Sequence, residues 1–109
     1  MDKADLEFVK QLTKDTHDGL IAWTRNKKLS GVLDETYKAE YQKTNIAIAR
    51  IESGYTVYLL WLFDYEDAKP LHSFFTYNVK KNQERAEAFV ELFLAAKTSW
   101  YRTVNRKRQ

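Results

Sequence analysis

The sequence predicts an α+β fold of two layers, in which an N-terminal helix, a four-stranded antiparallel meander and a C-terminal helix follow one another. Three observations predict this fold. Apolar residues recur every three or four positions near both ends of the chain, as they do on one face of a helix. In the middle they recur at every second position, as they do on one face of a strand. Short turn signals separate the expected strands, and short connections favour antiparallel pairing of neighbours.

The first helix is expected over residues 3 to 18. Its apolar stripe includes Leu6, Val9 and Leu12. Asp2 or Asp5 can cap its start, and Gly19 suits the left-handed residue that ends a helix. A short extended segment, Leu20 to Trp23, is expected to follow, and then a loop around residues 26 to 34.

Four strands are expected in the middle of the chain, over residues 36–42, 45–52, 55–65 and 71–77. In the first strand, apolar or aromatic residues alternate with Lys and Glu, which is typical of a half-buried strand. The expected turns are Lys43-Thr44, Ser53-Gly54 and residues 66 to 70, which include the only proline.

The second helix is expected over residues 82 to 105, with an apolar stripe that includes Phe89, Phe93 and Trp100. Three glutamates near its start complement the positive end of the helix dipole. The chain contains no repeat and no Pro/Gly-rich linker. We therefore expect a single domain over residues 1 to 109, with a basic tail at residues 102 to 109.

The composition restricts the class of protein. Of the 109 residues, 44% are hydrophobic and 30% are charged, which is the balance of a soluble globular domain. No run approaches the roughly 18 apolar residues of a membrane helix, and the first residues do not begin a signal peptide. The absence of cysteine excludes a disulfide scaffold, a thiolate metal site and a Cys nucleophile. We expect a cytoplasmic protein that does not bind a membrane.

The positive charge is concentrated at the C-terminal end. The chain has a net charge of +3, but residues 97 to 109 contain five Lys or Arg and no Asp or Glu. Residues 1 to 96 therefore have a net charge of −2. The basic end could contact phosphates or an acidic partner. Its cations could equally serve only to complement the negative end of the helix dipole.

The strand at residues 55 to 65 is apolar on both of its faces. Its even-numbered and odd-numbered residues point in opposite directions, and both sets are apolar. Because two helices cover only one face of a sheet, a second apolar face needs another cover. That cover could be the Leu20–Trp23 segment with the loop after it, a second copy of the chain, or a different protein. We expect the second face to consist of Ala47, Ala49, Tyr58, Leu60 and Leu62.

Motifs for catalysis are absent from the sequence. It contains no Gly-rich phosphate loop, no G-x-S-x-G elbow and no metal-binding HExxH spacing. The two histidines, His17 and His72, are expected to have structural roles. Asp15, His17 and Asp18 do not converge on one helix face, and the carboxylates at Asp64, Glu66 and Asp67 are typical of a solvated turn. We expect no enzymatic activity, no cofactor and no bound metal.

The first helix ends in a T-x-x-G-x-I-x-W pattern, from Thr16 to Trp23. The Tyr37–Tyr41 strand, the paired Ile46 and Ile48, and the Val90–Ala96 part of the last helix follow in order. This series resembles a loosely defined group of small bacterial and mobile-element proteins of unknown function. The resemblance implies the same helix–meander–helix topology and a bacterial or phage origin, but it implies no activity. Trp23 itself is expected to fill space between helix and sheet, with its N–H bonded to a nearby carbonyl.

Together these observations predict a non-enzymatic interaction module that self-associates or binds a protein partner through the second sheet face. On this hypothesis, Leu60→Glu should dissociate the assembly while the fold survives. The alternative is a nucleic-acid-binding protein that uses the basic end of the last helix. Its expected contacts are Arg102, Arg106, Lys107 and Arg108.

Overall fold

The computed structural model confirms the predicted order of a helix, an antiparallel meander and a second helix. It describes residues 3–26, 35–52, 54, 56–64, 72–77 and 83–107, with β5 and the last two residues of α2 described by their backbone only. The elements are α1 (Lys3–His17), β1 (Thr24–Arg25), β2 (Glu35–Tyr41), β3 (Thr44–Glu52), β4 (Thr56–Phe63), β5 (His72–Tyr77) and α2 (Gln83–Lys107).

The sheet contains one strand more than the sequence predicted. Its order is β1-β2-β3-β4-β5, and every neighbouring pair is antiparallel. The added strand β1 has only two residues, Thr24 and Arg25, which pair with Lys38 and Tyr37 at the edge of the meander. Two residues are too short for a periodic signal in the sequence, and the expected extended segment, Leu20 to Trp23, ends just before them.

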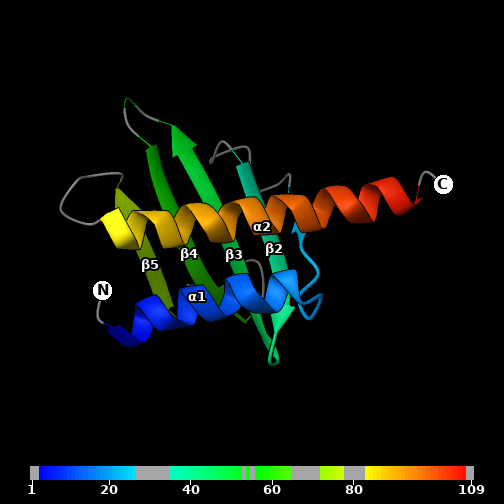
Figure 1. Cartoon of the computed structure of the whole chain (residues 1–109), viewed down its shortest axis with the longest axis horizontal. Coiled ribbons are helices and arrows are strands. Elements are labelled where there is room, and N and C mark those ends of the chain that lie inside the picture. The colour runs from blue at the N-terminus through cyan, green and yellow to red at the C-terminus, as the bar shows by residue number, and fades with distance from the viewer. Residues whose placement is uncertain are drawn as a thin grey trace.

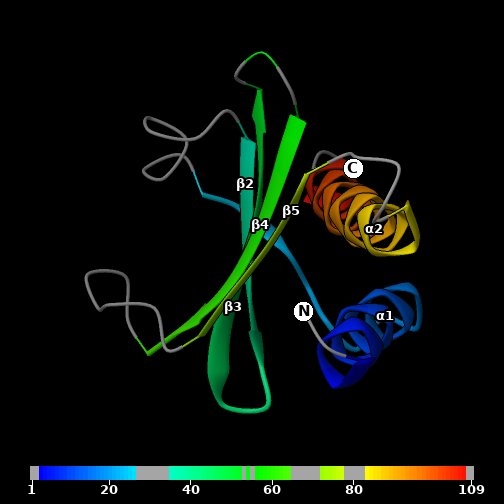
Figure 2. The ribbon, with the colours of Figure 1, turned by 90° about the vertical axis from the view of Figure 1, so that its left-hand side faces the viewer.

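Both helices lie side by side on the same face of the sheet and run in the same direction (Figure 1). Seen along the helices, the sheet forms one layer and the helix pair forms the other (Figure 2). Lys10 in the middle of α1 donates to Glu84 in the first turn of α2 at 2.9 Å, which joins the two helices. No helix in the described part of the chain is long and apolar enough to cross a membrane.

The core lies between the two layers and is centred on Phe93 of α2. The Phe93 ring packs edge-on against Tyr37 of β2 and Tyr58 of β4, with ring centroids 5.6 and 5.7 Å apart. The helices also contribute Val9, Leu12, Phe89 and Leu92, and the sheet contributes Ile46, Ile48 and Leu60, all of them fully buried. The helical and strand periodicities in the sequence therefore converge on one apolar core.

The chain leaves α1 through a tight glycine turn. Gly19 has φ +79°, the left-handed conformation predicted for the end of this helix. The Leu20 N–H donates to the Asp15 carbonyl at 2.8 Å, which satisfies a carbonyl of the last helical turn. This turn directs Ile21 and Trp23 into the core between the helices and the sheet.

Trp23 is fully buried between the two layers, as predicted, but its indole N–H bonds to a hydroxyl rather than to a carbonyl. The acceptor is Thr16 Oγ1 at 2.9 Å, and that hydroxyl donates its own proton to the Leu12 carbonyl at 2.7 Å. The Trp23 backbone N–H donates to Ser99 Oγ of α2 at 3.2 Å. The first and last residues of the T-x-x-G-x-I-x-W pattern are therefore a hydrogen-bonded pair.

We expect Thr16→Val to destabilise the fold, because it leaves the buried Trp23 N–H without an acceptor. The expected loss is about 1–3 kcal/mol of unfolding free energy, measured by urea unfolding followed by circular dichroism. Thr13→Val is the matched control, since Thr13 makes the same type of bond to the Val9 carbonyl but has no tryptophan partner. The control should change the unfolding free energy by less than about 0.5 kcal/mol. Equal losses in both variants would contradict this role of Thr16.

Candidate interaction surface

The strand register determines which residues share each face of the sheet. In β3 and β4, Ile48 pairs with Leu60 and Ile46 pairs with Leu62, so these side chains share the face that the helices cover. Ala47 pairs with Trp61 and Ala49 pairs with Leu59. Directly paired residues point to the same side of an antiparallel sheet, so these two pairs lie on the face away from the helices.

That outer face carries a continuous group of apolar residues. We call it the apolar patch; it consists of Ala47, Ala49, Ile51, Val57, Leu59, Trp61 and Phe63. The two alanines and Phe63 are buried, and the other four residues are half-buried. The rings of Trp61 and Phe63 lie next to each other, with centroids 6.5 Å apart. No helix in the described part of the chain packs over this patch (Figure 2).

The five residues predicted to form the second face do not lie on one face. Ala47 and Ala49 belong to the apolar patch, whereas Tyr58, Leu60 and Leu62 lie on the helix-covered side. Leu60 is fully buried in the core, so the expectation that Leu60→Glu preserves the fold is wrong as well.

The predicted residues are divided between two faces because the hairpin loop between β3 and β4 is longer than expected. The expected two-residue turn Ser53-Gly54 would pair Glu52 with Tyr55 and bring Ala49 opposite Tyr58. In the structure Glu52 pairs with Thr56, so three residues lie in the loop, and Gly54 has φ +78°. A shift of one residue in register moves every side chain of a strand to the opposite face.

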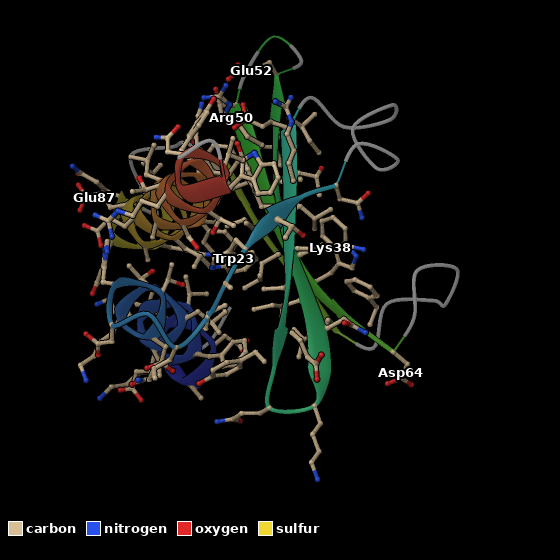
Figure 3. All side chains as sticks on the ribbon, turned by 90° about the vertical axis from the view of Figure 1, so that its right-hand side faces the viewer. Trp23, Lys38, Arg50, Glu52, Asp64 and Glu87 are labelled. Carbon is tan, nitrogen blue, oxygen red and sulfur yellow. The ribbon has the colours of Figure 1, made fainter. Side chains whose placement is uncertain are left out.

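Polar residues border the apolar patch beside the end of β4, where β2 and β3 lie next to it. They surround a hollow of about 420 Å³, lined in part by Lys38, Glu40, Asn45 and Asp64, with Phe63 at its apolar side. The Asn45 side-chain amide donates to the Asp64 carbonyl at 2.8 Å, which connects β3 to the end of β4. Lys38 extends to the side of the sheet away from the helices (Figure 3). An apolar centre with a polar border is the usual composition of a protein interface.

The Leu20–Trp23 segment does not cover the apolar patch. Ile21 and Trp23 are buried in the core on the opposite side of the sheet, and Trp23 is seen between the sheet and the helices (Figure 3). The loop expected at residues 26 to 34 lies outside the described residues, apart from Asn26.

A charged cluster lies at the other end of the sheet, between β2, β3 and α2. Glu35 accepts a 2.6 Å hydrogen bond from the Tyr37 hydroxyl and lies 3.4 Å from Lys97 and 3.7 Å from Arg50. Arg50 also stacks over Phe93, at 5.4 Å from the ring centroid. Sequence reasoning missed this cluster, because its members come from three distant parts of the chain.

The cluster shifts two pKa values in opposite directions. Burial opposes ionisation of Glu35, but the Tyr37 hydrogen bond and the cations Lys97 and Arg50 outweigh it and hold the pKa of Glu35 below its ordinary value. Burial, together with the hydrogen bond to Glu35, raises the pKa of the Tyr37 hydroxyl. The ion pairs of Glu35 with Lys97 and Arg50 therefore connect β2 to α2 and β3.

The predicted basic residues lie at the C-terminal end of α2. Arg102 is exposed, and α2 continues through the backbone of Arg106 and Lys107. Arg108 lies outside the described residues. The backbone therefore places the first three of these residues on the last two turns of one helix.

The histidines and carboxylates that the sequence analysis considered are separated in the structure. Asp15 accepts hydrogen bonds from Gln11 and Tyr41, at 2.8 and 2.7 Å, whereas His17 is exposed beside a groove of about 640 Å³ between α1 and α2. The described residues include no group of three His, Asp or Glu side chains that could hold a metal ion. Glu66 and Asp67, and the side chain of His72, lie outside what the structure describes.

Comparison of the chain with protein-family models, with curated proteins and with solved structures finds no match.

We expect Glu35→Gln to destabilise the protein at neutral pH and to reduce its loss of stability in acid. Because the folded pKa of Glu35 is depressed, its ion pairs stabilise the fold above the ordinary carboxyl pKa of 4.5 and are lost as the pH falls through the lower folded value. At pH 7 the expected loss of unfolding free energy is about 1–2 kcal/mol. The difference from the parent protein should shrink between about pH 5 and pH 3.

Urea unfolding at a series of pH values measures this difference. Glu7→Gln, at an exposed position of α1, is the control and should unfold like the parent. A Glu35→Gln deficit that stays constant down to pH 3 would show that Glu35 contributes through packing rather than through its charge.

Proposed function

We propose that this chain is a protein-interaction module that pairs with a second copy of itself through the apolar patch. The observation that carries the proposal is the register of β3 and β4, which places Leu59 and Trp61 beside Ala47 and Ala49 on the face away from the helices. Contiguous apolar surface of this kind on a soluble domain is typical of an interaction site.

The composition of the patch supports a protein partner rather than a small ligand. Trp61 is half-buried and is one of the residue types that contribute most to binding in protein interfaces, and the buried Phe63 supports its ring. Ala47 and Ala49 are small and buried, so the half-buried Leu59 and Trp61 on β4 form the accessible part of the patch. A broad apolar surface with aromatic residues is suited to another sheet or helix face.

The charges at the border support a second copy as the partner. Lys38 and Glu40 are two positions apart on β2, so they point to the same face and have opposite charges. In a two-fold symmetric contact, each surface meets its own image in the opposite direction. Such a contact can bring Lys38 of each copy towards Glu40 of the other, so the border complements itself.

We propose a binding role without catalysis. In the part of the chain that the structure describes, two carboxylates that could act in acid–base chemistry are occupied in structural contacts: Asp15 with Gln11 and Tyr41, and Glu35 with Tyr37 and Lys97. The cytoplasmic location and the bacterial or phage origin expected from the sequence belong to the same proposal.

Light scattering on a sizing column at two protein concentrations tests the proposed pairing. The parent protein should have a mass near twice 12.9 kDa at the higher concentration. Leu59→Glu places a charge in the centre of the contact, and it should lower the mass to 12.9 kDa with little change in the circular dichroism spectrum.

Two substitutions serve as controls. Leu94→Glu changes an exposed leucine on α2, away from the sheet, and should leave the mass unchanged. Leu60→Glu changes the neighbouring residue on the buried side and should unfold the protein. A parent protein that stays monomeric at both concentrations would contradict self-association. Unfolding by Leu59→Glu would instead indicate that the chain covers the patch itself.

A further inference from the structure

The C-terminal end of α2 extends beyond the body of the protein. The last buried residue of this helix is Ala96, and the described side chains from Lys97 to Asn105 are half-buried or exposed. In Figure 1 the end of α2 passes beyond the edge of the sheet and beyond α1. Lys97 still pairs with Glu35, Ser99 accepts the Trp23 backbone N–H, and Trp100 packs against the core. The projecting segment is therefore residues 101 to 107, which at 1.5 Å per residue is about 10 Å long.

Positive charge from two elements gathers at this end. Arg102 on α2 and Arg25 on β1 are both exposed, and neither forms an ion pair with the residues that the structure describes. Arg25 pairs with Tyr37 at the sheet edge, and the backbone N–H of Trp23, two residues earlier, bonds to Ser99 of α2, so β1 lies beside this part of the helix. Arg106 and Lys107 add two further cations on the last turn.

Several other cations in the described part of the chain are already paired with carboxylates. Lys10 pairs with Glu84, Lys14 with Asp18, and Lys97 with Glu35. Complementing the helix dipole requires cations only in the last turn of a helix. It does not account for Arg25, which lies on a strand, or for Arg102, which precedes that turn.

We propose that the projecting end of α2 binds double-stranded DNA by entering the major groove, with these cations on the phosphates. With its side chains a helix is about 10–12 Å wide, and the major groove of B-form DNA is about 12 Å wide and 8.5 Å deep. The projecting segment is longer than this depth, so it can enter before the body of the protein meets the duplex. The deep, narrow major groove of an RNA duplex does not admit a helix.

The distribution of the cations fits contacts with both walls of a groove. An α-helix turns by roughly 100° per residue, so backbone positions 102, 106 and 107 are spread around more than one side of α2. Phosphates lie along both edges of the major groove, and no Asp or Glu follows Glu91 in the chain to repel them. The expected binding is governed by phosphate contacts and therefore depends steeply on salt.

Fluorescence anisotropy with a labelled 20-base-pair DNA duplex tests this proposal. The full chain should bind the duplex at 50 mM salt, and its affinity should fall about 40-fold between 50 and 200 mM salt if three phosphates are neutralised. The combined variant Arg102→Ser, Arg106→Ser and Lys107→Ser should weaken binding at least about tenfold and flatten the salt dependence. Its circular dichroism spectrum should match the parent, because these residues lie beyond the core.

The matched control removes three exposed cations elsewhere in the protein, so it has the same net charge as the variant with Arg102, Arg106 and Lys107 replaced. It combines Lys3→Ser, Lys14→Ser and Lys43→Asn, and it should keep the affinity within about threefold of the parent. Equal loss in both variants would overturn a localised site. Equal binding of an RNA duplex or of single-stranded DNA would overturn groove entry, and no binding at 50 mM salt would overturn the proposal as a whole.

Discussion

Trp23 is fixed to both helices by its own two N–H groups, the indole N–H to Thr16 of α1 and the backbone N–H to Ser99 of α2. Immediately after it, Thr24 begins the strand that pairs with β2. One buried residue therefore determines where α1, α2 and the edge of the sheet lie relative to one another. Within the described residues, this junction bonds to both helices and leads directly into the sheet, so it holds the two layers together.

The sheet separates two surfaces of different character, and the loop between β3 and β4 determines which residues belong to each. On the inner side, Phe93 brings two tyrosines and Arg50 together, and the paired charges around Glu35 close the upper end of the core. On the outer side, small alanines on β3 lie beside large residues on β4. The two helices of the same chain cover the inner surface, whereas the outer surface has the composition of an interface.

The helix–meander–helix order followed from local periodicity, because each element is long enough to repeat its pattern several times. The apolar character of both faces of β4 was also evident from the sequence. The local pattern could not determine the pairing register of β3 and β4. A loop of two residues and a loop of three residues around Gly54 both fit the same turn signal. The cluster of Glu35, Arg50 and Lys97 was hidden for a different reason, since only the folded chain brings these residues together.

Because α2 follows the strands of the sheet in the sequence, it is synthesised after them. Ile48 and Leu60 are made before α2, so the part of the sheet that α2 covers stays uncovered until the ribosome releases residues 83 to 107. For that interval the nascent sheet has apolar side chains on both faces. The newly made chain is then most exposed to association with other nascent chains, and α2 ends this period by covering one face.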